Sequence, residues 1–218
     1  MIRLVTLLLC WVAASPLTLV AAPERWAADI AKLTQHDEAQ KIPRDAVVFV
    51  GSSSIVLWNS LTADFPGIPV IQRGFGGSEL ADSVHYADRI VLPYRPRAVV
   101  LYAGENDITA GKTPETVAAD FEAFRTKIHV ALPNAVIYYL SMKLSPSRAK
   151  VKASMLRANE LIAAACAQGR NCIYVDVNGP MLDVAGEPRP ELFQTDMLHM
   201  RPEGYAIWKK VLSPLLQP

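Results

Sequence analysis

Residues 47–58 read VVFVGSSSIVLW, and this stretch decides the fold. An apolar run ends at a glycine, and three serines then lead into a second apolar run. A short apolar run bounded by turn residues predicts a buried strand, while serines favour turns and helix N-termini. In α/β enzymes a strand-to-helix turn of this kind exposes reactive side chains. The stretch therefore predicts a buried first strand and a turn in which one serine hydroxyl could be a nucleophile.

The rest of the chain alternates short apolar runs with amphipathic stretches. This alternation predicts βαβ units around a parallel sheet, hence an α/β fold. The expected strands are residues 46–50, 69–72, 98–102, 135–140 and 172–177. Apolar residues at helical spacing predict helices around 26–33, 80–91, 114–132, 151–165 and 202–212. Polar loops follow the strands, at the edge where such sheets bind ligands.

The first 22 residues differ in character from the remainder. Arg3 precedes a long apolar stretch that ends in small residues, which is typical of an export signal cleaved near Ala21 or Ala22. We therefore expect a periplasmic or secreted protein with one domain over residues 23–218. The apolar stretch is also long enough to leave an uncleaved membrane anchor over residues 4–20 open.

Charge and cysteine content narrow the possible partners. Removing residues 1–22 takes away Arg3 alone and leaves equal numbers of basic and acidic residues, so nothing favours nucleic acid or an anionic membrane surface. Cys166 and Cys172 then remain, and in an oxidising compartment they could form a disulfide. The sequence does not indicate an oligomeric state.

A serine nucleophile needs a histidine base, and the base works best beside a carboxylate. The four histidines are His36, His85, His129 and His199. His199 stands three residues after Asp196, just before the last helix. Asp82 and His85 have the same spacing, but within a helix, where we expect both to face solvent. We read the other two histidines as a surface residue and a helix-end residue.

An acyl-transfer site also needs donors for the oxyanion. Gly74-Phe75-Gly76-Gly77 after the second strand offers backbone N–H groups, and Asn106 after the third strand offers an amide. A dinucleotide-binding GxGxxG motif would need glycine at position 79, where the chain has Glu79. Taken singly, these residues fit ordinary turns and caps equally well.

In combination, GSSS, GFGG, GEND and DMLH resemble in their order the four motif blocks of the SGNH hydrolases, the GDSL-type esterases and lipases. The resemblance spans about residues 45–215. It implies a three-layer α/β/α, flavodoxin-like sandwich with a five-stranded parallel sheet of order 2-1-3-4-5. It also implies Ser53 as nucleophile, His199 as base, Asp196 as acid, and the Ser53 N–H, Gly77 N–H and Asn106 as oxyanion donors. No metal or cofactor is implied.

The chain departs from a GDS block at Ser52, where aspartate is usual. Ser52, as a turn former, and Ser54, as a helix cap, remain rival nucleophiles. Asp176, at the end of the fifth strand, remains a rival for orienting His199.

The expected function is a serine esterase that hydrolyses short-chain, acetyl-type carboxylic esters of a small molecule or saccharide. Two alternatives stay open: an O-acetyltransferase acting on a cell-envelope glycan, and a catalytically silent carbohydrate-binding domain. Two further sets of residues are ambiguous. Trp58, Phe75, Met142 and Met197 either line an acyl pocket or pack the core, and Arg73, Glu105 and Lys143 either contact a polar leaving group or face solvent.

Overall fold

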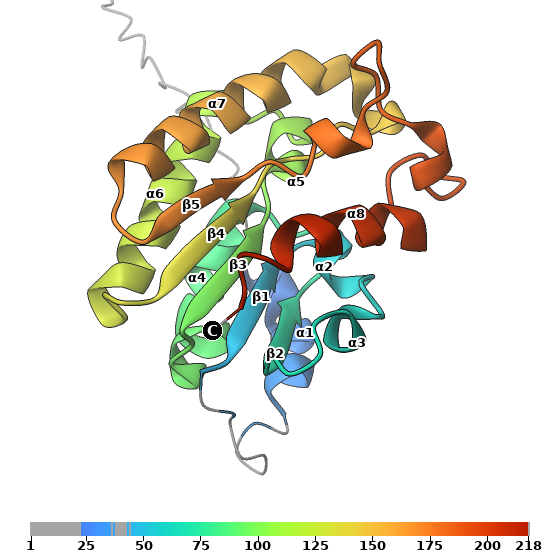
Figure 1. The fold of residues 1–218 in the computed structure, drawn as a ribbon. Coiled ribbons are helices and arrows are strands. Elements are labelled where there is room, and N and C mark those ends of the chain that lie inside the picture. Colours follow the sequence, from blue (N-terminus) through green and yellow to red (C-terminus); the bar gives the residue numbers. More distant parts are fainter. Residues whose placement is uncertain (1–22, 36, 38–42, 44, 218) are drawn as a thin grey trace, which may run out of the picture.

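The fold is that of a computed structural model, which describes residues 23–35, 37, 43 and 45–217 (Figure 1). The expected signal peptide or anchor and His36 lie outside the described residues. Within the described part of the chain, no helix combines the length and apolar character needed to span a bilayer.

Five parallel strands form the sheet, in the order β2-β1-β3-β4-β5. They are β1 (Val47–Gly51), β2 (Val70–Gly74), β3 (Ala98–Tyr102), β4 (Val136–Leu140) and β5 (Cys172–Val175). The predicted α/β class and strand order are confirmed. β1 and β2 extend beyond their predicted ends to Gly51 and Gly74, because Gly51 pairs with both Gly74 and Tyr102.

Helices cover both faces of the sheet (Figure 1). One face carries α1 (Ala27–Thr34), α4 (Leu80–Ile90), α6 (Pro114–Ala131) and α7 (Lys152–Gln168). The other carries α2 (Ser53–Val56), α3 (Leu61–Asp64) and α8 (Pro202–Leu212). The short α5 (Glu105–Thr109) follows β3. The 3-10 helices are η1 (Pro23–Trp26), η2 (Leu92–Tyr94), η3 (Pro146–Val151), η4 (Gly179–Met181) and η5 (Pro190–Leu192).

Alternate strand residues build two separate cores. In β1, Val48 and Val50 pack under α4 and α6, whereas Val47 and Phe49 point to the opposite face. All are fully buried, as expected for a parallel sheet covered on both sides. This arrangement leaves the carboxyl ends of the strands as the edge where polar loops gather.

Four residues were predicted either to line an acyl pocket or to pack in the core, and they fall into two groups. Trp58, Phe75 and Met142 are buried and belong to the two cores, whereas Met197 is 40% exposed. The core explanation therefore holds for the first three.

Cys166 and Cys172 come together as free, buried thiols. Their sulfur atoms lie 2.9 Å apart. The contact raises the pKa of the Cys166 thiol, and burial adds to that effect. The structure thus brings the predicted pair into contact and leaves it unbridged.

The prediction that Asp82 faces solvent is wrong. Asp82 is fully buried, because α1 packs over this part of α4, and its carboxylate accepts hydrogen bonds from the Trp26 indole at 3.0 Å and the Glu79 N–H at 2.8 Å. It completes a capping box at the start of α4. His85 is exposed, as expected.

Candidate active site

The turn after β1 places Ser53 as the first residue of α2. Gly51 has φ +141°, and a Cβ there would lie 2.0 Å from the Tyr102 carbonyl oxygen, so only glycine fits. The N–H of Ser52 donates to that same oxygen at 3.1 Å, which fixes the turn to β3. A glycine is therefore required where the strand turns into the helix that starts with Ser53.

Ser52 and Ser54 do not occupy the predicted positions, in which Ser52 forms the turn and Ser54 caps the helix. Ser52, not Ser54, occupies the N-cap position of α2, without a side-chain cap hydrogen bond. Ser54 is buried within the helix, and its carbonyl accepts a hydrogen bond from the Tyr205 hydroxyl at 2.9 Å. Of the three serines, Ser53 is the one whose hydroxyl meets a histidine.

Ser53, His199 and Asp196 form a continuous chain of hydrogen bonds. The Ser53 hydroxyl lies 2.9 Å from His199 Nε2, and His199 Nδ1 lies 2.6 Å from Asp196 Oδ2. Because a carboxylate only accepts, Nδ1 carries the proton and Nε2 is left to accept from the serine. The ring is therefore held in the tautomer that a general base needs.

The segment between η5 and α8 holds this histidine in place. The N–H of Gln194 donates to the His199 carbonyl at 2.7 Å, and Phe193 pairs with Met200 in an antiparallel bridge. Met197 adopts φ +55° at the tip, and its carbonyl accepts from the N–H of Ser147 in η3 at 3.1 Å. We call residues 194–200 the histidine loop.

The Asp196 carboxylate is a stable anion. Partial desolvation raises its pKa, but the N–H groups of Leu198 and His199 and the His199 ring outweigh this and lower the pKa to about 2. Because its pKa is lower in the folded than in the unfolded state, the Asp196 carboxylate stabilises the fold at pH values above its ordinary pKa of 3.8. This stabilisation is lost as the pH falls towards 2. Asp196 therefore stays charged at any pH at which a histidine can act as a base.

The two predicted oxyanion elements are tied to each other and to the nucleophile turn. The N–H of Phe75 donates to the Gly51 carbonyl at 2.9 Å, and a Cβ at Gly76 would lie 3.9 Å from Ser53 Cβ. Gly77 has φ +75°, which lets the chain turn there. Asn106 Nδ2 donates to the Ser78 carbonyl at 2.9 Å. Because an amide nitrogen carries two protons, the second can serve an oxyanion.

Helix α5, which carries Asn106, is anchored on one side by Asp107. The Leu80 N–H is shared between the two oxygens of this buried carboxylate, at 3.0 and 3.1 Å, and Asp107 also pairs with Lys112 at 2.9 Å. Burial raises the pKa of Asp107 in spite of these donors. The bond to Leu80 joins α5 to the start of α4, directly after the Gly76-Gly77 turn.

On its other side α5 is held by a buried ion pair that the sequence did not reveal. Lys143 Nζ lies 3.0 Å from both carboxylate oxygens of Glu105 and 3.2 Å from the Tyr102 hydroxyl. The Lys143 side chain is 1% exposed and the Glu105 side chain 7%. Both residues are therefore occupied with each other rather than with a substrate or solvent.

Arg73 likewise has partners of its own. Its guanidinium pairs with Asp37 at 2.7 Å and donates to the Tyr94 hydroxyl at 2.7 Å. It lies at the outer strand of the sheet and has no role in the proposed chemistry.

Replacing Lys143 with methionine should lower the free energy of unfolding by about 3–5 kcal/mol, because it leaves the Glu105 carboxylate buried without its partner. Urea unfolding followed by circular dichroism measures this loss. The double variant Lys143→Met, Glu105→Gln should recover part of it, since no buried charge remains. A single variant as stable as the wild type would contradict the buried pair.

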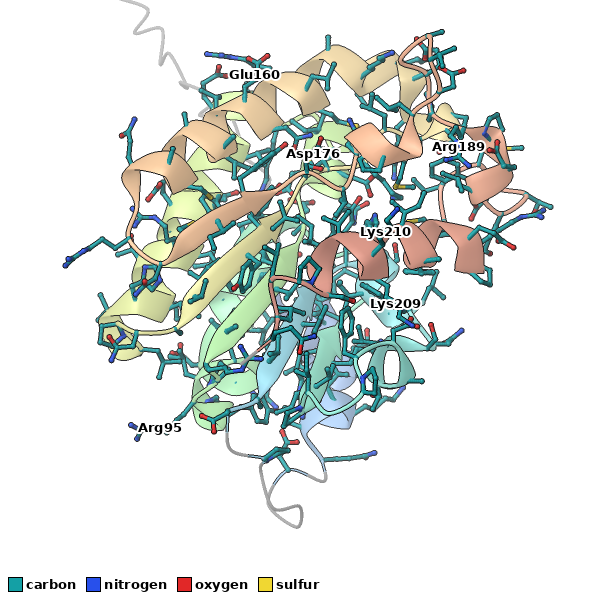
Figure 2. The ribbon with its side chains drawn as sticks, in the orientation of Figure 1. Arg95, Glu160, Asp176, Arg189, Lys209 and Lys210 are labelled. Atoms are coloured by element: carbon teal, nitrogen blue, oxygen red, sulfur yellow. The ribbon has the colours of Figure 1, made fainter. Side chains whose placement is uncertain are left out.

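The remaining candidates do not reach Ser53. His129 bonds the Ala135 carbonyl at 3.1 Å, at the amino end of β4 and therefore at the opposite edge of the sheet from Ser53. Asp176 lies directly beyond β5 (Figure 2), where it accepts hydrogen bonds from the N–H groups of Asn178 and Gly179. Neither His129 nor Asp176 therefore belongs to the hydrogen-bonded chain of Ser53, His199 and Asp196. Among the described residues, no group of three or more His, Cys, Asp or Glu could hold a metal ion.

Comparisons with known proteins address the family. The model of the GDSL-like lipase/acylhydrolase family matches residues 48–207, which include all four motif blocks. No curated protein matches the chain.

Solved structures share the fold at low sequence identity. A Streptococcus pneumoniae protein described as a candidate platelet activating factor has a TM-score of 0.79 at 19% identity, covering 89% of this chain and 96% of its own. A GDSL-like lipase from Bacteroides thetaiotaomicron has a TM-score of 0.70 at 20% identity, covering 90% and 97%. An acetylxylan esterase from Geobacillus stearothermophilus has a TM-score of 0.64 at 13% identity, covering 79% and 94%.

Proposed function

The chain belongs to the GDSL-like lipase/acylhydrolase family, and we propose that within it this protein is a serine esterase acting on short-chain, acetyl-type esters. The observation that carries the proposal is the hydrogen-bonded chain from Ser53 through His199 to Asp196, with distances of 2.9 and 2.6 Å. Unrelated folds use the same arrangement for acyl transfer.

In the proposed mechanism Ser53 Oγ attacks the ester carbonyl carbon while its proton passes to His199 Nε2. The negative charge that develops on the carbonyl oxygen is stabilised by the N–H groups of Ser53 and Gly77 and by the Asn106 amide, each such donor being worth about 10²–10³-fold in rate. The bond to the alcohol oxygen then breaks, and Nε2 returns the proton to that oxygen. Water releases the acid from Ser53 by the same steps, and Asp196 stabilises the imidazolium each time.

Exposure of the site supports a small acyl group. The side chains of His199 and Asp196 are 25% and 44% exposed. Trp58 and Met142 are buried in the two cores and offer no wall for a long acyl chain, whereas Phe75 also lines, with Val56 and Gly76, a pocket of about 410 Å³ beside the nucleophile turn. One structural relative is an acetylxylan esterase, which fits an acetyl group on a sugar.

A series of p-nitrophenyl esters tests the acyl preference. We expect kcat/KM for the acetate to exceed that for the octanoate by at least about tenfold, because the exposed His199 and Asp196 side chains belong to an open site, which leaves much of a long acyl chain in water. A value of kcat/KM that rises with chain length would show a lipase instead. Product analysis with an added glycan acceptor would detect acetyl transfer.

We also propose that the protein is exported and that residues 1–22 are its signal peptide. Mass spectrometry of the mature N-terminus after expression in a host with an export pathway would show whether cleavage occurs near Ala22.

A further inference from the structure

Trp26 packs against Gly77, the glycine whose N–H is proposed to hold the oxyanion. It lies in residues 23–34, which form η1 and α1 and which we call the η1–α1 segment. The family model matches residues 48–207 and so does not include this segment. A Cβ on Gly77 would lie 3.3 Å from Trp26 Cη2 and 3.8 Å from Cζ2. The edge of the indole therefore covers the side of Gly77 from which a side chain would project.

The indole of Trp26 has partners that fix its orientation. Its Nε1 donates to Asp82 Oδ2 at 3.0 Å, and the same oxygen accepts the Glu79 N–H at 2.8 Å. The Asp82 side chain is fully buried, so the fold sets the position of this acceptor. Phe75 meets the indole edge-on, with 5.8 Å between the ring centroids and 71° between the ring planes. The hydrogen bond and the aromatic contact together hold Trp26 against the turn.

Arg25, the preceding residue, contacts both the indole and the glycine. Its Cζ lies 4.7 Å from the centroid of the Trp26 ring, and its Nη2 donates to the Gly77 carbonyl at 3.5 Å. The same nitrogen lies 3.6 Å from the Asp82 carboxylate. The Arg25 side chain is 48% exposed, so its charged contacts are weak. Trp26 therefore makes the main contact between the η1–α1 segment and the turn.

The turn needs such support because glycines form its tip. Gly77 is exposed and has φ +75°. A glycine has no side chain to anchor it and loses more conformational freedom on folding than any other residue. Asn106 holds the next residue, since its Nδ2 donates to the Ser78 carbonyl at 2.9 Å. An oxyanion donor is effective only when it is held within about 0.5 Å of its productive position.

We propose that Trp26 is a positioning residue, which holds the Gly77 N–H at the place where the oxyanion forms. Asn106 fixes the carbonyl that follows Gly77, and Trp26 fixes Gly77 itself. The inference rests on the proposed esterase function, because only acyl transfer gives the Gly77 N–H an oxyanion to bind. It makes the η1–α1 segment part of the support of the active site, although the segment carries no reacting group.

Two variants remove different parts of the contact. Trp26→Ala deletes the ring, whereas Trp26→Phe keeps an aromatic ring and loses the N–H that bonds Asp82. We expect kcat for p-nitrophenyl acetate to fall about 10–100-fold in Trp26→Ala and about 3–10-fold in Trp26→Phe, less than the cost of about 10²–10³-fold for removing a donor outright. KM should stay unchanged, because the oxyanion forms only in the transition state. Trp26→Phe also carries the test if Trp26→Ala does not fold.

Inhibition by trifluoroacetone separates a positioning role from a loss of folded enzyme. Ser53 Oγ adds to the carbonyl carbon of the inhibitor, the Ser53 proton passes to His199 Nε2, and the carbonyl oxygen becomes an anion bound by the oxyanion donors. The inhibition constant should therefore rise by the same factor by which kcat falls. A variant that merely contains less folded enzyme would lose rate without any change in this constant.

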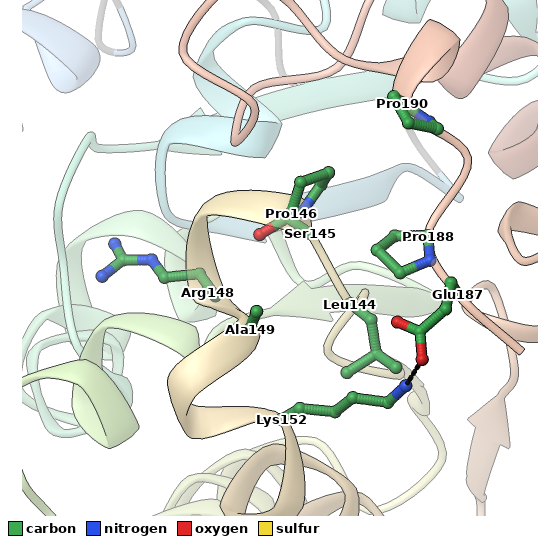
Figure 3. Close-up of a pocket in the computed structure, with 9 residues that line it drawn as sticks. All are labelled: Leu144, Ser145, Pro146, Arg148, Ala149, Lys152, Glu187, Pro188 and Pro190. Atoms are coloured by element: carbon green, nitrogen blue, oxygen red, sulfur yellow. Dashed lines mark hydrogen bonds and ion pairs between the residues drawn. The ribbon is translucent and has the colours of Figure 1, made fainter.

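Two controls alter contacts away from the turn. Ile128→Ala empties a fully buried position near the end of α6, which leads to the amino end of β4. Lys152→Met breaks the ion pair with Glu187, at 2.7 Å, in a pocket that no predicted oxyanion donor lines (Figure 3). Ile128→Ala should lower the melting temperature, and both controls should leave kcat, KM and the inhibition constant unchanged.

Hydrogen–deuterium exchange of residues 74–80 reports on the turn without any chemistry. Exchange should be faster in Trp26→Ala than in the wild type and unchanged in Ile128→Ala. If the wild type hydrolyses no ester, the esterase function fails, and the exchange rates alone then decide whether Trp26 holds the turn.

With an active wild type, the inference is overturned if Trp26→Ala keeps the wild-type kcat and inhibition constant. It is also overturned if kcat falls while the inhibition constant stays the same, because the loss is then one of folded enzyme. A rise in KM alone would show that Trp26 contacts the substrate and does not position Gly77. None of these three results would remove Ser53 or His199 from the proposed mechanism.

Discussion

Replacing Ser53 with alanine should lower kcat for p-nitrophenyl acetate by at least about 10⁴-fold, because no other described hydroxyl is hydrogen-bonded to His199 Nε2. Any remaining rate would come from the oxyanion donors and from substrate binding. The melting temperature should not change, since the Ser53 hydroxyl has His199 as its hydrogen-bond partner and alanine is an excellent helix former. Initial rates over a range of substrate concentrations give kcat, and a thermal melt gives the stability.

The neighbouring serines supply matched controls for Ser53→Ala. Ser52→Ala should keep kcat within about threefold, because the Ser52 side chain makes no cap hydrogen bond. Ser54→Ala should do the same, since it is the backbone carbonyl of Ser54 that bonds Tyr205. A fluorophosphonate probe should label the wild type and both controls but not Ser53→Ala. Substantial turnover by Ser53→Ala would remove Ser53 from the mechanism.

The probe also separates the remaining functional alternatives. A silent carbohydrate-binding domain would bind sugar without being labelled, whereas an O-acetyltransferase would be labelled and would pass acetyl groups to a glycan rather than to water. The same Ser53 adduct serves hydrolysis and transfer, so labelling alone does not distinguish those two.

Most of the sheet could be predicted from the sequence because β1, β3, β4 and β5 contain continuous apolar runs, whereas β2 also carries Gln72 and Arg73. β3 was predicted at its true bounds, since Ala98–Tyr102 is apolar throughout and directly follows the charged Arg97. The ends of β1 and β2 were missed, because Gly51 and Gly74 read as turn residues. Only their pairing across the sheet makes them part of the strands.

The parts of the site that escaped prediction depend on contacts between distant segments. Helical periodicity placed Asp82 away from the core, but it could not show that Trp26 would pack over that face and bond the carboxylate. Lys143 and Glu105 follow different strands, and only the parallel pairing of β3 and β4 brings them together. Burial of a charged pair has no local sequence signal, because each residue alone looks like a solvated loop residue.

The proximity of the motif residues could be predicted from the sequence for a physical reason. Ser53, Asn106 and His199 all follow strands or precede a helix at one edge of the sheet, so topology alone brings them near one another. The DMLH spacing then lets Asp196 Oδ1 accept the N–H groups of Leu198 and His199 while Oδ2 faces the His199 ring. Such a turn is local, and local geometry is what short motifs encode.

Asp196→Asn should show how much of the rate depends on that turn. The asparagine oxygen can keep both backbone N–H bonds, so the histidine loop should hold its shape and the melting temperature should change little. The amide nitrogen would then face His199 Nδ1 and donate to it. This forces the ring proton onto Nε2, which can no longer accept the proton of Ser53.

We therefore expect kcat for Asp196→Asn to fall by about 10²–10⁴-fold, with KM nearly unchanged. Raising the pH should not restore the rate, because the loss comes from the wrong tautomer and not from protonation of the carboxylate, whose pKa in the wild type is about 2. Asp176→Asn is the matched control and should keep kcat within about threefold, since Asp176 bonds backbone N–H groups beyond β5 and not the histidine. If the two variants exchanged these effects, Asp176 would be the residue that orients His199, and the histidine loop would have to move to reach it.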